Sequence, residues 1–170
     1  MSGPTTQHRR GAARYRAAAP RLRGTAPVRR MGFSFAGEPA QVAKARHRVA
    51  AVLGLAWGDG PAAEDATLVA SEVLTNGCRY GGGRVRVRAR ISDERMILKV
   101  STPAPWRDPQ AQHDPVGDES GRGLEIVMAL AASVIIAPDT DGPGISVTVV
   151  CLAASVQTAS SRQVADVSAA

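Results

Sequence analysis

Residues 71–83, SEVLTNGCRYGGG, decide the fold of this chain. Within this stretch and just before it, apolar residues recur at near-helical spacing: Leu68, Val69, Val73 and Cys78. Three consecutive glycines, 81–83, then end the pattern in the way that glycines commonly end helices. The stretch therefore predicts the second half of a helix that spans about residues 62–79.

Two polar residues share one face of this predicted helix. Glu72 and Asn76 are four residues apart, and Val69 and Val73 fall on the same stripe. Burying an unpaired carboxylate is costly, so a buried pair of this kind needs a partner, a metal or a ligand. The alternative is a helix rotated so that both side chains are solvated.

Length, composition and charge restrict the kind of protein this chain can be. The chain has 170 residues, enough for one domain with a real core, and 44% of them are hydrophobic but only 4% aromatic. The core must therefore consist mainly of Val, Leu, Ile and Ala. Residues 1–30 hold eight arginines and no acidic residue, which leaves 13 basic and 15 acidic residues in the rest. Because the body is close to neutral, it lacks the basic character of a nucleic-acid-binding fold.

Cysteines and hydropathy add two expectations. Cys78 and Cys151 have no CxxC or His spacing around them, so buried core thiols are expected rather than a disulfide or a metal site. No apolar run approaches the ~18 residues of a membrane span, and the N-terminus has no apolar segment of a secretory signal. A cytoplasmic location is the expectation, with an organellar transit peptide as the alternative for the Arg- and Ala-rich start.

The chain divides into a basic tail over residues 1–30, expected to be disordered, one ordered domain over residues 31–153, and a flexible tail over residues 154–170.

The first half of the domain is expected to hold a short strand 33–35, a helix from residue 38 to Gly54 or Gly58, the helix 62–79, and strands 84–91 and 96–101. A long loop 102–120 follows. The second half is expected to hold a helix that follows residues 121–123, and strands 133–137 and 145–152, which are joined by a turn.

Strand 84–91 alternates strictly between arginine and apolar residues. Such a row of arginines is either a basic patch or the solvated face of a strand buried on one side. Together with the element order, it predicts an α+β fold: a two-layer sandwich with a mostly antiparallel mixed sheet and helices on one face.

The loop 102–120 carries four prolines and leads into Gly121, Arg122 and Gly123. Long loops inside compact domains are usually functional or disordered, so this loop is a candidate lid. Glycines that open a helix offer free backbone N–H groups to a phosphate. Asn76 can give an oxygen to Mg²⁺, and Glu72 can accept a proton from an attacking hydroxyl or water.

The motif Glu72-x-x-x-Asn76, the strand pair, the loop and Gly121-Arg122-Gly123-Leu124 resemble the GHKL ATP-binding fold of gyrase, heat-shock chaperones, histidine kinases and MutL. The resemblance covers about residues 33–152, and within it the short form is similar to the anti-sigma-factor serine/threonine kinases, the RsbW/SpoIIAB-like group of actinobacterial type.

The resemblance implies ATP and Mg²⁺ as cofactors. It implies that Asn76 binds Mg²⁺, that Glu72 is the general base, and that Gly121, Arg122, Gly123 and Leu124 hold the phosphates and the lid. It places Ser146 near the adenine. As partners it implies an anti-anti-sigma (STAS-type) protein, a sigma factor and a second copy of the chain in a homodimer.

One position departs from the family. Thr102 stands where the family usually has the Asp that accepts a hydrogen bond from the adenine amino group, and Ala104 and Pro105 replace the glycines that follow. Asp108, the next carboxylate, is six residues further on and is not expected to substitute. Loss of the charge-assisted bond costs on the order of 1–2 kcal/mol, so ATP binding is expected to be weaker or lost.

Three functional hypotheses follow. The first is an ATP-dependent protein serine/threonine kinase that acts on a STAS-type partner and sequesters a sigma factor. The second is a catalytically weak binding module with the same fold, favoured by Thr102. The third is a nucleic-acid-associated protein that binds through the arginine-rich tail and the arginines 84, 86, 88 and 90. For this hypothesis, truncation of residues 1–30 should reduce affinity steeply.

Overall fold

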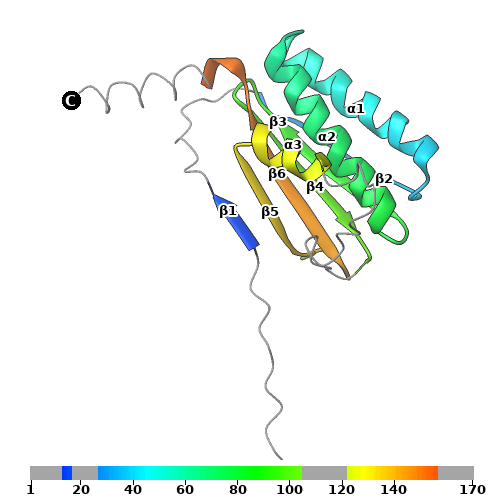
Figure 1. Ribbon diagram of the computed structural model, residues 1–170. Coiled ribbons are helices and arrows are strands. Elements are labelled where there is room, and N and C mark those ends of the chain that lie inside the picture. The colour runs from blue at the N-terminus through cyan, green and yellow to red at the C-terminus, as the bar shows by residue number, and fades with distance from the viewer. Residues whose placement is uncertain (1–12, 17–26, 105–121, 157–170) are drawn as a thin grey trace, which may run out of the picture.

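The computed structural model describes residues 13–16, 27–104 and 122–156. Within these residues, helices α1, α2 and α3 lie on one face of a six-stranded sheet (Figure 1). The strands are β1 Ala13–Arg16, β2 Arg29–Phe35, β3 Val85–Ile91, β4 Arg95–Thr102, β5 Ser133–Pro138 and β6 Ile145–Leu152, and the helices are α1 Pro39–Trp57, α2 Pro61–Tyr80 and α3 Arg122–Leu130. The predicted α+β two-layer sandwich is therefore confirmed.

The strand order in the sheet is β1-β5-β6-β4-β3-β2. All five pairings between the described strands are antiparallel. Strand β6, the last of the described strands, inserts between β5 and β4. The middle of the sheet therefore forms only when this C-terminal strand pairs with both neighbours. The order places β2 at one edge and β1 at the other.

Strand β1 corrects one expectation. The segment 1–30 was expected to be disordered, yet Ala13–Arg16 pairs with Ser133–Ile136 of β5, and β2 begins at Arg29. The remainder of that segment up to residue 26, and the predicted tail beyond residue 156, lie outside the described residues. A four-residue strand such as β1 forms only where an existing sheet edge supplies its hydrogen bonds, and for this reason the sequence of the strand alone gave no signal.

Both long helices begin at a proline and end near a glycine. Pro39 and Pro61 occupy the first turns of α1 and α2, where a missing N–H costs little. Helix α1 ends at Gly58, the second of the two predicted ends, with a φ of 69°. Helix α2 ends at Gly81, and Gly82 follows with a left-handed φ of 62°. These ends match the predicted ones within one or two residues.

The core lies between the helices and the sheet and is almost entirely aliphatic. Its largest fully buried side chains are Leu53, Leu74, Ile91, Met96 and Leu98, together with six valines. Cys151 is buried in this core, where burial and the charge of Asp65 raise its pKa to about 12. Cys151 is therefore a packing residue, as predicted. None of the helices in the described part of the chain is long and apolar enough to cross a membrane.

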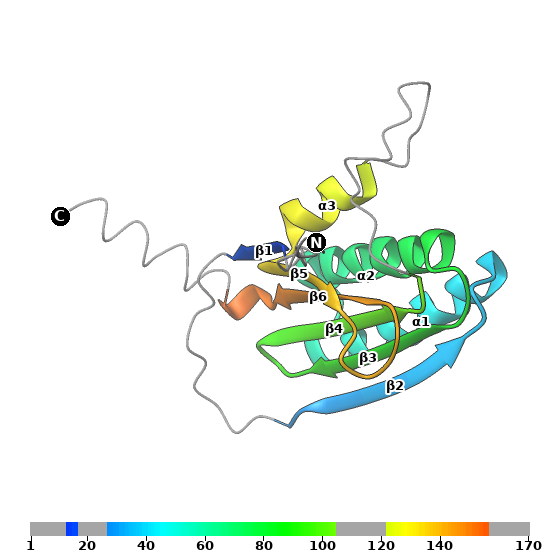
Figure 2. The ribbon, with the colours of Figure 1, turned by 90° about the horizontal axis from the view of Figure 1, so that it is seen from below.

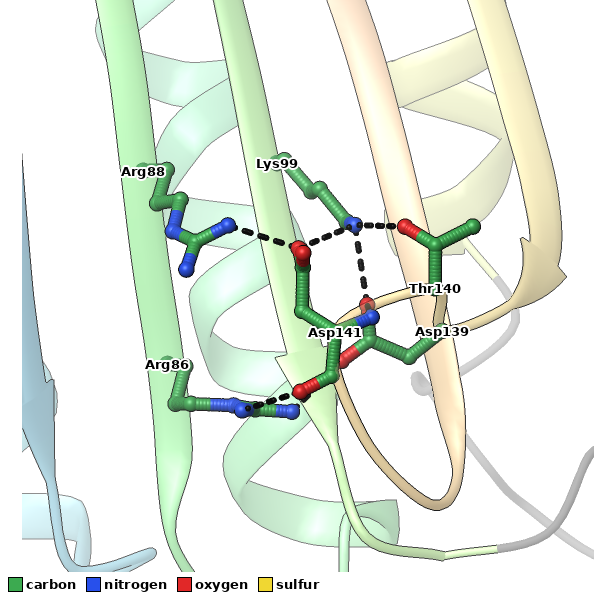
Figure 3. Close-up of polar contacts among 6 residues, drawn as sticks. All are labelled: Arg86, Arg88, Lys99, Asp139, Thr140 and Asp141. Carbon is green, nitrogen blue, oxygen red and sulfur yellow. Dashed lines mark hydrogen bonds and ion pairs between the residues drawn. The ribbon is translucent and has the colours of Figure 1, made fainter.

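The other face of the sheet carries an ion-pair cluster rather than a bare row of arginines. The connection between β5 and β6 curls back over β4 and β3 (Figure 2). There Asp139 contacts Arg86 at 2.6 Å and Lys99 at 2.8 Å, while Asp141 contacts Arg88 at 2.6 Å and Lys99 at 3.0 Å (Figure 3). The Asp139 side chain is fully buried. The cluster therefore fastens the β5–β6 connection to the sheet.

Candidate functional site

Glu72 and Asn76 project from α2 on the side where α3 packs. Both residues are half-buried, and they lie one helical turn apart. The preceding turn of the same helix is fully buried at Val69 and Ala70. The alternative of two fully solvated side chains is therefore excluded.

Gly123 of α3 brings the two predicted motifs together. A β-carbon at position 123 would lie 2.5 Å from Glu72 Oε2 and 3.9 Å from Asn76 Nδ2. Gly123 is buried, and it is the second residue of α3. The N-terminal turn of α3, with backbone N–H groups that have no partner within the helix, therefore lies directly beside the carboxylate and the amide.

The other residues of the glycine motif occupy the same helix end. Arg122 is the first residue of α3 and is exposed, and Leu124 is half-buried. Gly121, like the loop residues that precede it back to residue 105, lies outside the described residues. An exposed arginine beside a helix N-terminus can reach an anionic ligand that the helix end attracts.

Thr102 lies at the end of β4, under the C-terminal half of α2. It is only 6% exposed. Its methyl carbon Cγ2 would be 2.7 Å from a β-carbon at Gly81 and 3.5 Å from one at Gly77. The two glycines therefore let α2 approach Thr102 closely, and the threonine presents its methyl group to the helix.

Ser146 is not brought to this site. In β6 it is paired with Ser101, whereas Thr102 is paired with Ile145. Because successive side chains of a strand alternate between faces, Ser146 lies on the face opposite to Thr102 and the helices. The structure thus separates Ser146 from Glu72 and Asn76, although all were predicted for one site.

The chemistry of the site suits a magnesium–nucleotide complex. An amide, a carboxylate and a helix N-terminus converge in one place, and Mg²⁺ bound to phosphates needs few protein oxygens. The described residues contain no group of three or more His, Cys, Asp or Glu side chains that could hold a metal ion by themselves. Asn76 is thus the residue that would contribute to the metal, with phosphate oxygens supplying other ligands.

The comparison with protein families agrees with the fold. Residues 35–151 match the model of the histidine kinase-like ATPase domain, which is more than half of the chain. The chain therefore belongs to the histidine kinase-like ATPase family, the GHKL class of ATP-binding domains. A comparison with curated proteins found no match.

Three glycines, 77, 81 and 144, lie close to Thr102, a role that no pattern in the sequence indicates. Gly77 and Gly81 lie where α2 and its C-terminal end contact the Thr102 side chain. Gly144, in the β5–β6 connection, contacts the Thr102 carbonyl group. Gly144 has a φ of 104°, which side chains rarely tolerate. Their spacing in the sequence gives no hint of a shared neighbour, because the contacts depend on the order of strands in the sheet.

Proposed function

We propose that this protein is an ATP-dependent serine/threonine kinase of the anti-sigma-factor type, which phosphorylates a Ser or Thr of a STAS-type partner and sequesters a sigma factor. The proposal is supported by one observation above the others: Gly123 packs against Glu72 and Asn76, so the two halves of the motif form one site. Its finer part, the kinase activity and the partners, rests on the resemblance of residues 71–83 and 120–127 to that group.

In this proposal each side chain has one task. Asn76 holds Mg²⁺, and Glu72 accepts the proton from the hydroxyl that attacks. Arg122 and the N–H groups at the start of α3 hold the phosphates. ATP supplies the phosphoryl group, and Mg²⁺ neutralises charge on its phosphates. The work of the protein is mainly positioning and charge neutralisation.

A second candidate function is favoured by Thr102. Among the described residues no carboxylate lies at the end of β4, and Asp139 and Asp141 of the nearby connection are paired with cations on the other face. With Thr102 the adenine loses a charged acceptor, which weakens ATP binding roughly tenfold. A binding module that keeps the fold but transfers phosphate slowly would act through contact with its partner.

Phosphotransfer separates the two candidates. The purified chain is incubated with radiolabelled ATP, Mg²⁺ and each STAS-domain protein of the source genome. Under the kinase proposal, one of these proteins acquires label on Ser or Thr, and Glu72→Gln abolishes the labelling. Glu64→Gln, an exposed residue in the first turn of the same helix, is the matched control and should label normally. If the chain binds ATP but no STAS-domain protein becomes labelled, the kinase proposal is overturned and the binding-module function remains.

A further inference from the structure

A groove lies at the opposite side of the domain from α3, between α1 and the edge strand β2. Its volume is about 430 Å³. Strand β2 is the last strand of the sheet at this side, so its outer edge has no strand partner among the described residues (Figure 2). Backbone N–H and C=O groups at such an edge can pair with a further strand.

Two phenylalanines form the apolar part of the groove. The Phe33 and Phe35 rings are stacked with their centroids 6.3 Å apart, and the Arg48 guanidinium lies 5.2 Å from the centre of the Phe33 ring. Phe35 is buried and Phe33 half-buried. The side of the groove formed by β2 is therefore apolar, and the Arg48 guanidinium lies above it.

The rim of the groove is positively charged. Lys44 and Arg48 are exposed on successive turns of α1, and neither has an ion-pair partner among the described residues. The acidic residue in this region is Glu38, which accepts from Gln41 at 3.3 Å. Two cations against one carboxylate leave the groove with a net positive charge.

We propose that this groove binds an extended acidic segment of a partner protein, which adds to β2 as a further strand. In this mode the backbone edge of β2 supplies hydrogen bonds and the alternate side chains of the added strand supply specificity. Apolar side chains on the helix side of the added strand would contact Phe33 and Phe35. Acidic side chains would pair with Lys44 and Arg48.

The groove fits a peptide better than two other occupants. A nucleic acid needs open aromatic faces for its bases, whereas the Phe33 ring is already stacked on Phe35 and covered by Arg48. A second copy of this chain paired through β2 would bring two positive rims together, which is repulsive.

Peptide selection on the full-length chain without nucleotide tests this inference. Random displayed peptides of about ten residues, enough for one strand and its flanks, are the probe. The peptide that is enriched most is then labelled, and its affinity is measured by fluorescence anisotropy for the wild type, Arg48→Glu and Lys44→Glu. Arg90→Glu is the matched control, since Arg90 is exposed on the other face of the sheet. Amide hydrogen exchange over residues 29–35 locates the bound peptide.

The expected result is enrichment of acidic peptides with alternating apolar residues. Arg48→Glu and Lys44→Glu should each weaken binding about tenfold, Arg90→Glu less than about twofold, and β2 amides should exchange more slowly in the complex. The inference is overturned by enrichment of neutral or basic peptides, by equal effects of Arg48→Glu and Arg90→Glu, by displacement of the peptide by single-stranded DNA, or by protection of β2 at high protein concentration without peptide. Because no ATP is present, none of these outcomes bears on the kinase proposal.

Discussion

Gly123 of α3 lies so close to Glu72 of α2 that a β-carbon at position 123 would come within 2.5 Å of the Glu72 carboxylate. This contact joins residues that are about fifty positions apart in the chain, and it defines where α3 begins relative to α2. The atom in the way is the far end of a flexible side chain, so a substitution here should displace the carboxylate rather than unfold the domain.

Gly123→Ala is therefore predicted to reduce function without a large loss of stability. Phosphotransfer should fall at least about tenfold, because displacement of Glu72 removes a positioned base. The melting temperature should stay within a few degrees of the wild type, since alanine also favours the helix. A double-mutant cycle with Glu72→Ala measures the coupling: the cost of Gly123→Ala in stability should vanish when Glu72 is already truncated. If Gly123→Ala destabilises the Glu72→Ala variant as much as the wild type, the new β-carbon collides with backbone atoms and not with the Glu72 side chain.

Thr102→Asp is predicted to raise affinity for ATP roughly tenfold, because a carboxylate accepts a stronger hydrogen bond from the adenine amino group than a hydroxyl does. The same change should lower the melting temperature without nucleotide, since Thr102 is buried and a carboxylate there would lose its hydration. Calorimetric titration and thermal unfolding measure the two effects. Thr102→Asn is the control for shape without charge, and an equal gain in affinity from Asn would rule out the charge as its cause.

Two glycines of the domain should respond to alanine in opposite directions. Gly144 has a φ of 104°, and a β-carbon there would overlap the Thr102 carbonyl oxygen, so Gly144→Ala should lower the free energy of unfolding by at least about 2 kcal/mol. Gly54 lies inside α1 with nothing within 4 Å of a new β-carbon, so Gly54→Ala should raise it by up to about 1 kcal/mol. Urea denaturation gives both values. Equal effects would contradict the packing of the β5–β6 connection against Thr102.

The ion-pair cluster predicts how stability depends on pH in acid. Burial alone would raise the pKa of Asp139, but the hydrogen bonds from Lys99 and the Asp141 backbone N–H, with the charges of Lys99 and Arg86, bring it below the usual 3.8. The hydrogen bond from Lys99, followed by the charge of Arg88, likewise lowers the pKa of Asp141. Groups with lowered pKa values stabilise the fold above their unfolded pKa, and this stabilisation is lost as the pH falls through the folded pKa.

Stability of the wild type should therefore decline below about pH 4, and Asp139→Asn should decline less steeply there. At neutral pH the same variant should melt several degrees lower, because Arg86 and Lys99 lose a buried charged partner. Asp93→Asn, an exposed position in the β3–β4 turn, is the control and should behave as the wild type. Identical acid profiles for Asp139→Asn and the wild type would contradict this role of the cluster.

The elements with local signals could be predicted from the sequence. The spacing of Val69 and Val73 with the glycines that follow predicts α2, and the alternation of arginine with Val85 and Val87 predicts β3. The closeness of Glu72 to the Gly123 motif was implied by the family resemblance, not by any spacing in the chain.

Features that depend on strand order could not be predicted. The insertion of β6 between β5 and β4 determines that Ser146 pairs with Ser101 and faces away from the helices. The same strand order brings Asp139 into contact with Arg86. In the sequence, Asp139 belongs only to a predicted turn, and Arg86 lies 53 residues before it. These contacts arise when the sheet is assembled, so no local pattern encodes them.

The assignment of the site requires that Asn76 and its neighbours bind Mg·ATP, and titration calorimetry of Mg·ATP into the purified chain measures this binding. We expect the wild type to bind in the micromolar range, more weakly than Thr102→Asp. Binding should be abolished by Asn76→Ala and unchanged by the control Glu64→Ala in the first turn of α2. If neither the wild type nor Thr102→Asp binds the nucleotide, or if Asn76→Ala binds as tightly as the wild type, the assignment of the site is contradicted.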